Sequence, residues 1–232
     1  LFIQAKTGSG KTASYLIPLL IHARKALIIS PTRELALQIE KEARRIASYT
    51  TLHIACLIGG MDYKKQENSL RMKPDIIIAT AGRLLDLFSQ NKIDFSLLDC
   101  VILDEADQLI RTAQYHDVLS VLQKIPQEVQ TVCLSATWEV ELADYLLGKY
   151  TFIQTDKNEL NKDIQACHIL TEEKLKTLRK ILKNEPVLKA IVFVNHKSDA
   201  QYLEQKLKHQ NILCASFSSR LEENKRIRTI NQ

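Results

Sequence analysis

A short glycine-rich run, "AKTGSGKT" at residues 5 to 12, is the first stretch of the chain that could do chemistry. Backbone amides around Gly8 and Gly10 can point inward and surround an anion, because glycine leaves the backbone open to a phosphate group. Lys11 can reach the outer phosphates of a nucleotide, and Thr12 can place its hydroxyl on Mg²⁺. A glycine-rich surface turn is the plain alternative. The predicted phosphate site consists of Ala5, Lys6, Thr7, Gly8, Ser9, Gly10, Lys11 and Thr12.

Two neighbouring carboxylates, Asp104 and Glu105, follow the apolar run from Cys100 to Leu103. Such a run is typical of a buried parallel strand, and α/β sheets bind ligands at the carboxyl ends of their strands. Asp104 can take Mg²⁺ through water, and Glu105 can orient or deprotonate an attacking water. A helix N-cap is the common alternative for an isolated acidic pair. Together with the phosphate run, the pair predicts catalytic residues Lys11, Asp104 and Glu105 and metal ligands Thr12 and Asp104.

These residues need a sheet that brings strand ends together, and residues 1 to 155 have the pattern of one. Short runs that are apolar on both faces alternate with longer amphipathic segments, which favours a doubly wound α/β domain with a parallel sheet. The expected strands are 26–30, 53–59, 75–80, 101–105, 131–136 and 150–155, and the expected helices include 33–47 and 139–150.

A polar segment without hydrophobic period, residues 156 to 163, is expected to be a linker to a second α/β series in residues 164 to 232. About 70 residues are few for a doubly wound domain, so we expect this second domain to be incomplete. Ser198 and Gln201 have the spacing of a capping box at a helix start. The expected strands are 166–170, 190–195 and 212–217, and the expected helices are 172–184 and 198–210.

The net charge of +5 is unevenly distributed. Residues 1 to 163 hold 19 basic and 20 acidic side chains, whereas residues 164 to 232 hold 13 and 7. A basic excess in the last third is expected if that part faces a polyanion, and a solvated helix face explains it as well.

The five cysteines are scattered, mostly within apolar runs, and form no C-x-x-C pair. We interpret them as reduced core thiols, which indicates a reducing, intracellular compartment and argues against a structural zinc site. No run of about 18 apolar residues is present, so membrane spanning is disfavoured.

Several short motifs follow the phosphate run in a fixed order: "PTRELA" at 31–36, "GG" at 59–60, "TAGR" at 80–83, "DEAD" at 104–107 and "SAT" at 135–137. As a set they resemble the DEAD-box family of ATP-dependent RNA helicases, in superfamily 2. The resemblance implies a RecA-like domain of the P-loop NTPase type, followed by an incomplete second RecA-like domain. It also implies ATP and Mg²⁺ as cofactors, and RNA bound mainly through sugar and phosphate. We expect a monomer.

The resemblance assigns roles to further residues. Asp107 would join Ser135, Ala136 and Thr137 in a hydrogen-bonded link between the ATP site and RNA. Arginines on an RNA path add charge without reading sequence. For Arg83 alone, a solvated residue at a helix start is the alternative. The RNA path would be lined by Pro31, Thr32, Arg33, Glu34, Gly59, Gly60, Thr80, Gly82 and Arg83.

The chain departs from the family pattern at several positions. A carboxylate among the second-domain departures, at Glu223, would repel phosphate, so we expect altered RNA contacts there. The departures are Ala5 for the first glycine of the phosphate run, Ala81 for proline, His196 for threonine, Ser218 and Ser219 for His-Gly, and Glu223 for glutamine.

Two arginine motifs of the family, R-G-x-D and H-R-x-G-R-x-x-R, do not occur in the 232 residues. The family's adenine-reading glutamine motif would lie before Leu1. We therefore expect a piece of a longer protein that hydrolyses ATP poorly by itself, because a missing arginine finger costs roughly 10³ to 10⁵ in rate.

The leading prediction is an ATP-dependent RNA helicase that closes two RecA-like domains over RNA and locally unwinds duplexes or remodels ribonucleoproteins. An RNA clamp or scaffold without productive turnover and a DNA-directed helicase are the alternatives. An intracellular location is expected, whether nuclear, nucleolar or cytoplasmic.

Overall fold

The structure is a computed structural model that describes residues 1–6, 8–22, 24–111, 114–137, 144, 146–155, 165, 167–184 and 187–216. The chain separates into two compact units, Leu1–Leu160 and Asn161–Gln232. The predicted linker, 156–163, lies outside the described residues, as does half of the helix predicted at 139–150.

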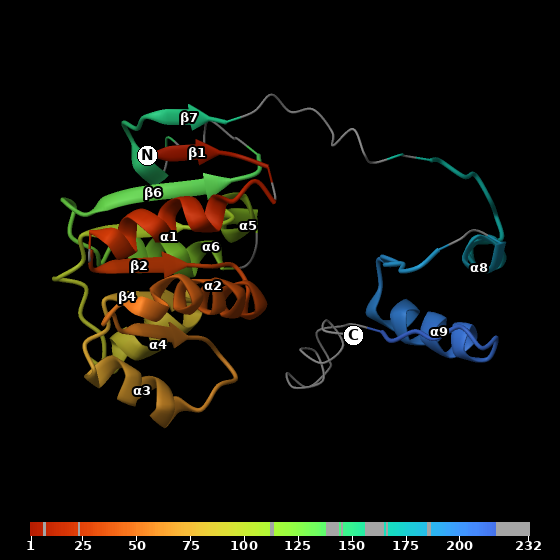
Figure 1. Ribbon diagram of the computed structural model, residues 1–232, viewed down its shortest axis with the longest axis horizontal. Coiled ribbons are helices and arrows are strands. Elements are labelled where there is room, and N and C mark those ends of the chain that lie inside the picture. The colour runs from red at the N-terminus through yellow and green to blue at the C-terminus, as the bar shows by residue number, and fades with distance from the viewer. Residues whose placement is uncertain are drawn as a thin grey trace. The chain divides into compact units, whose positions relative to one another are not determined.

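A parallel sheet forms the centre of the first unit, with seven strands among the described residues (Figure 1). Its strand order is β3-β4-β2-β5-β6-β1-β7. The strands β2 to β5 are buried along their whole length, which explains why their sequences are continuous apolar runs. The bounds are β1 Phe2–Gln4, β2 Ala26–Ile29, β3 Ile54–Leu57, β4 Ile76–Ala79, β5 Cys100–Leu103, β6 Gln130–Ser135 and β7 Phe152–Gln154.

Helices cover both faces of this sheet (Figure 1). Successive strand residues point to opposite faces, so Leu27 and Ile29 belong to one apolar cluster while Ala26 and Ile28 belong to the other. Helices α1 (Lys11–Ile21) and α2 (Arg33–Ile46) pack on the second cluster, and a 3-10 turn, η1 (Ala47–Tyr49), follows α2. The first cluster is covered by α3 (Tyr63–Arg71), α4 (Ala81–Ser89), α5 (Ala106–Arg111) and α6 (Tyr115–Leu122).

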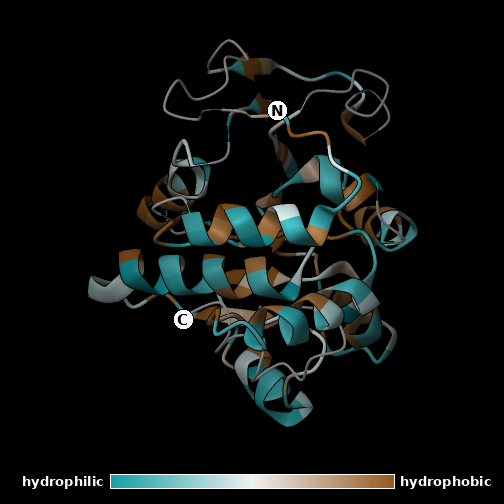
Figure 2. Ribbon diagram, turned by 90° about the vertical axis from the view of Figure 1, so that its right-hand side faces the viewer, coloured by the Kyte–Doolittle hydropathy of each residue, from teal (hydrophilic) through white to brown (hydrophobic). Residues whose placement is uncertain are grey.

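The predicted doubly wound α/β fold is therefore confirmed. Figure 2 shows the helices striped with hydrophilic and hydrophobic residues, the amphipathic pattern on which the prediction rested. No described helix is both long enough and apolar enough to cross a bilayer.

In the described residues of the second unit, the regular elements are two helices, α8 (Lys174–Asn184) and α9 (Lys197–Lys208). The strands predicted at 166–170, 190–195 and 212–217 are wrong, because the described residues of these segments carry no strand pairing. Phe193 and Leu213 are 91% and 101% exposed. Three short strands and two helices offer too little buried apolar surface to stabilise a sheet.

The predicted capping box is also wrong. Helix α9 begins at Lys197, and its N-cap is His196. Because the helix starts before Ser198, that serine lies inside the first turn, where its hydroxyl bonds to Asp199 at 3.3 Å.

The cysteines divide between the two units. Cys56, Cys100 and Cys133 are buried in the sheet, and burial raises the pKa of each thiol. Cys167 is exposed and Cys214 is half-buried. The prediction of core thiols fails for these two because the strands expected to bury them do not form.

Candidate nucleotide and RNA site

The predicted site residues gather at the carboxyl edge of the sheet, in the loops and helix starts that follow six strands (Figure 1). Residues predicted to bind nucleotide follow β1 and β5, and the coupling residues lie at the end of β6. Residues predicted to bind RNA follow β2, β3 and β4. The strand order therefore places the RNA group on one half of the edge and the nucleotide group on the other, and they meet at β2 and β5.

The phosphate loop joins β1 to α1. Gly8 and Gly10 have φ angles of +81° and +87°, and a Cβ at either position would meet nothing within 4 Å. Among the described residues no side chain caps α1, so its first amides face the loop. The Lys11 Nζ donates to the Ala5 carbonyl at 2.7 Å and so curls over the loop. Open amides beside an amino group fit the phosphates of a nucleotide. Thr7 lies outside the described residues.

The acidic pair follows β5 directly. Asp104 is 3% exposed, and its Oδ1 accepts from the Glu105 N–H at 2.9 Å. Burial raises the pKa of Asp104 in spite of its hydrogen bonds. Burial, followed by the charges of Asp104 and Asp107, also raises the pKa of Glu105, whose φ is +49°. Crowded carboxylates beside the Thr12 hydroxyl supply the oxygen ligands that Mg²⁺ prefers.

Tyr15, which the sequence reasoning missed, connects the two predicted metal ligands. Its hydroxyl donates to Asp104 Oδ2 at 2.8 Å, and Thr12 hydrogen-bonds to the same hydroxyl. Burial and the Asp104 charge raise the pKa of Tyr15, so it remains a proton donor. The available signal was a tyrosine in the buried stripe of α1, because a buried tyrosine hydroxyl needs a partner.

The structure brings the four predicted coupling residues together. Thr137 Oγ1 donates to Asp107 Oδ2 at 3.0 Å, and the Thr137 N–H donates to Ser135 Oγ at 3.2 Å. The Ala136 carbonyl accepts from Gln4 Nε2 at 3.4 Å. The end of β6 is thus bonded to α5 on one side and to β1 on the other.

Gln4 is a second residue that the sequence reasoning missed. It ends β1, is 6% exposed, and its Oε1 accepts from Gln154 Nε2 at 3.2 Å. Its amide therefore spans from β6 to β7 across the strand that carries the phosphate loop. A glutamine that closes an apolar strand immediately before the loop was the signal in the sequence.

On the RNA half, the turn after β2 leads into α2. Thr32 is the N-cap, and its Oγ1 accepts from the Leu35 N–H at 3.1 Å. Pro31 is buried beneath this turn, while Arg33 is exposed on the first turn of α2. Glu34 is the acidic residue of that turn, where its charge suits the helix dipole.

Arg33 lies directly against the loop that follows β3. A Cβ built on Gly59 would come 2.7 Å from Arg33 Nη2, so glycine is what allows the guanidinium to approach. Gly60 is exposed and has a φ of +85°. The structure thus joins the groups predicted from "PTRELA" and "GG".

Arg83 lies in the first turn of α4, with its side chain held against the loop that follows β3. Its side chain is 13% exposed, so the solvated alternative is wrong. The Nε donates to the Ile58 carbonyl at 3.3 Å, Nη1 pairs with Asp86 Oδ2 at 2.9 Å, and the guanidinium lies 5.0 Å from the centre of the Tyr63 ring. Arg83 therefore anchors α4 to the loop after β3.

Thr80 and Gly82 begin the same helix. Thr80 is the N-cap of α4, without a side-chain bond to it in the described residues, and Ala81 is buried in the core. A Cβ on Gly82 would lie 3.3 Å from Asp117 Oδ2. A carboxylate of α6 thus lies close to the start of α4.

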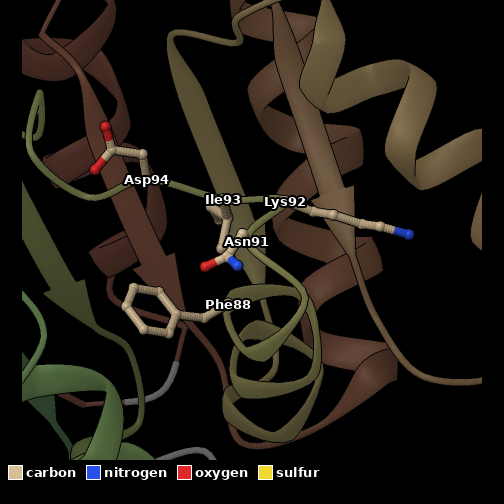
Figure 3. A pocket seen from close by; sticks show the side chains of 5 residues that line it. All are labelled: Phe88, Asn91, Lys92, Ile93 and Asp94. Carbon is tan, nitrogen blue, oxygen red and sulfur yellow. The ribbon is translucent and has the colours of Figure 1, made fainter.

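A separate shallow pocket lies beyond the other end of α4 (Figure 3). None of the predicted site residues lines this pocket. Its lining residues come from the end of α4 and the segment that leads toward β5. Its lining residues are Phe88, Asn91, Lys92, Ile93 and Asp94.

Residues 1–145 match the family model described as DEAD/DEAH box helicase. The chain belongs to this family. Among curated members, RhlB of Pseudomonas putida, an ATP-dependent RNA helicase, is 30% identical over 249 residues, covering 98% of this chain and 63% of its own. The ATP-dependent RNA helicase DDX54 of Mus musculus is 35% identical over 238 residues, covering 96% and 27%. The chain therefore spans less than two thirds of these relatives.

Several solved structures also resemble the chain. A hypothetical ATP-dependent RNA helicase from Sulfolobus tokodaii is 32% identical with a TM-score of 0.62, covering 88% of this chain and 62% of its own. Mss116p bound to single-stranded RNA and AMP-PNP is 28% identical with a TM-score of 0.79, covering 99% and 54%. Dbp5 of S. cerevisiae is 23% identical with a TM-score of 0.85, and the match covers 99% of this chain and 61% of Dbp5. It shares the RecA-like fold.

Proposed function

We propose that the protein is an ATP-dependent RNA helicase, in which RNA-stimulated ATP hydrolysis drives local duplex unwinding or ribonucleoprotein remodelling. The observation that supports this proposal most is the division of the carboxyl edge. Lys11 and the acidic pair of Asp104 and Glu105 meet on one half, while Arg33 and the glycine loop meet on the other. The printed names of the relatives, and the RNA and AMP-PNP held by Mss116p, agree with it.

Residues of the phosphate loop would hold ATP, and Thr12 with Asp104 would hold Mg²⁺. When bound, Mg²⁺ neutralises charge that develops on the phosphates during transfer. Lys11 can exchange its bond to the Ala5 carbonyl for a phosphate oxygen. Tyr15 orients Asp104 from the side of α1, because its hydroxyl occupies Oδ2.

Glu105 is the proposed base for the attacking water. A carboxylate with a raised pKa accepts a proton more readily near neutral pH than an ordinary one, and burial with two neighbouring carboxylates provides this shift. An RNA clamp without turnover has less need of such a group. The retained Glu105 therefore favours the helicase over the clamp.

RNA would bind through sugar and phosphate, so its affinity should fall with salt and tolerate changes of sequence. The proposed RNA contacts are the exposed side chain of Arg33 and the backbone of Gly59 and Gly60. Arg83 holds the same loop through its bond to the Ile58 carbonyl. A monomeric protein in an intracellular compartment remains part of the proposal.

The test is ATP hydrolysis with and without RNA, in the protein together with any sequence that flanks this chain. Lys11→Ala should abolish nucleotide binding, whereas Lys41→Ala, at an exposed lysine of α2, should not. Glu105→Gln should bind ATP and RNA but hydrolyse roughly 10² to 10⁴ times more slowly. Equal hydrolysis by wild type and Glu105→Gln would support the clamp, and stronger competition by DNA than by RNA would support a DNA-directed enzyme.

We expect the 232-residue chain by itself to show little RNA-stimulated hydrolysis, because it contains neither R-G-x-D nor H-R-x-G-R-x-x-R. A loss of that arginine contribution costs roughly 10³ to 10⁵ in rate. Rapid turnover by the purified chain that Lys11→Ala removes would contradict this expectation.

A further inference from the structure

Gln66 is a buried amide in a helix that otherwise faces solvent or is half-buried. It is 3% exposed, and it is the residue of α3 that is fully enclosed. Burying an amide is unfavourable unless each of its polar atoms finds a hydrogen-bond partner. The partners of Gln66 therefore show what the residue holds in place.

All of these partners belong to the loop between β3 and α3. Gln66 Oε1 accepts from the Ile58 N–H at 3.0 Å. Its Nε2 donates to the carbonyls of Ile58 at 3.1 Å and Met61 at 3.2 Å, with a longer contact to Asp62 at 3.5 Å. A single side chain thus forms hydrogen bonds to both ends of the loop from Ile58 to Asp62.

The enclosed loop contains Gly59 and Gly60. Gly59 lies against the Arg33 guanidinium, and Gly60 has a left-handed backbone. The Ile58 carbonyl that accepts from Gln66 also accepts from Arg83 Nε at 3.3 Å. Gln66 of α3 and Arg83 of α4 therefore both hold the Ile58 end of the loop. Arg33 approaches the loop at Gly59, from the start of α2.

We propose that Gln66 is a positioning residue for RNA, which holds the Gly59–Gly60 loop so that its backbone and the Arg33 guanidinium face the same phosphate group. This inference rests on the proposed RNA-binding function. A loop already held in its binding conformation loses less conformational entropy when RNA binds. Gln66 itself does not contact RNA.

Gln66→Met tests the proposal in the protein together with any sequence that flanks this chain, because methionine keeps the length of the side chain and removes its hydrogen bonds. RNA affinity is measured by fluorescence anisotropy with a single-stranded RNA and Mg²⁺–AMP-PNP at several salt concentrations. We expect affinity to fall about tenfold, as one lost charge-assisted contact would predict. The slope of log affinity against log salt should shrink by about 0.7 for one lost phosphate contact.

Two readouts separate positioning from a general loss of structure. Binding of a fluorescent ADP analogue should be unchanged, because the phosphate loop lies on the other half of the sheet edge. Asn68→Met makes a matched change at an exposed position of α3 and should leave RNA affinity and salt slope unchanged. Thermal unfolding of each variant shows whether it is folded.

Gln66→Glu is the second variant if methionine prevents folding. It keeps an acceptor for the Ile58 N–H but has no donors for the carbonyls, so RNA binding should again weaken. A folded variant of either kind with wild-type RNA affinity and salt slope would overturn the inference. Unfolding of both variants would assign Gln66 to stability alone and would overturn it too. A wild-type protein, tested with any sequence that flanks this chain, that binds nucleotide but no RNA would instead refute the proposed function.

Discussion

The Tyr15 hydroxyl donates a 2.8 Å hydrogen bond to Asp104 Oδ2, which joins the helix of the phosphate loop to the acidic end of β5. Both residues are buried, at 5% and 3% exposure. Asp104 is therefore held in a fixed orientation. The acidic half of the site is organised by a residue that belongs to none of the predicted motifs.

Replacing Tyr15 with phenylalanine should destabilise the protein. The change removes the only hydroxyl that reaches Asp104 Oδ2 among the described hydrogen bonds and leaves that oxygen buried. Hydrogen bonds to charged groups contribute about 1.5–3 kcal/mol, so we expect the free energy of unfolding to fall by about that amount. Urea unfolding measures it, and Tyr49→Phe, at a fully exposed tyrosine, should change nothing. Equal losses for both variants would contradict the role of Tyr15.

The buried Asp104 carboxylate should reduce stability as pH rises when no metal is present. Burial raises its native pKa above the ordinary 3.8, so the native state holds the proton more tightly than the unfolded state. Stability therefore falls as pH rises from about the unfolded pKa through the native pKa. Asp104→Asn should be more stable than wild type at pH 7 without Mg²⁺, and the difference should vanish below pH 4. Thermal unfolding against pH tests this, and a variant less stable at pH 7 would refute it.

The contribution of Asp75 to stability should depend on pH in the opposite direction to that of Asp104. Burial acts to raise its pKa, but hydrogen bonds from Lys25 Nζ, at 2.7 Å, and from the His53 N–H outweigh it, so the native pKa is lowered. The native state then releases its proton more readily, and the contribution to stability is present above pH 4 and lost as pH falls through the native pKa. Asp75→Asn should thus be less stable than wild type at pH 7 and equal to it in strong acid. The same unfolding series measures both aspartates, and parallel curves would contradict the assignment.

The first unit could be predicted from the sequence because its strands are buried on both faces. Runs such as Ala26–Ile29 and Ile76–Ala79 are then apolar at every position, and their sequence shows the parallel sheet directly. The second unit has runs of the same kind, at 190–195 and 212–217, but local pattern does not supply the neighbours that strand pairing needs. An apolar run indicates a strand only where the rest of a sheet covers it.

A candidate site could be proposed from the sequence where the chemistry depends on residue type in a short motif. Lys11, Asp104 and Arg33 were candidates because each lies beside glycines or strand ends that suit its predicted role. Tyr15 was missed because its partner Asp104 lies 89 residues away in the chain. Gln66 was missed because its partners are backbone groups of a loop that wraps around the side chain only in the fold. Nothing in the sequence of α3 distinguishes a glutamine that holds a loop from one that faces water.

The two neighbouring glycines of the loop after β3 should respond differently to alanine. At Gly60 the φ of +85° is unfavourable for any residue with a Cβ, so Gly60→Ala should lower the free energy of unfolding by about 1–2 kcal/mol. At Gly59 the nearest atoms to the new Cβ would belong to the flexible end of Arg33, the closest at 2.7 Å, so the guanidinium must move while the fold changes little.

Gly59→Ala should therefore keep nearly wild-type stability and still bind single-stranded RNA several-fold more weakly, with a smaller salt slope, because Arg33 is displaced. Urea unfolding and RNA anisotropy on the same preparations separate the two effects. Arg33→Ala in the Gly59→Ala background gives a further check, since displacement and removal of the same guanidinium should not add. If Gly59→Ala binds RNA as wild type does, or if the two changes add in full, Arg33 does not contact phosphate from this position.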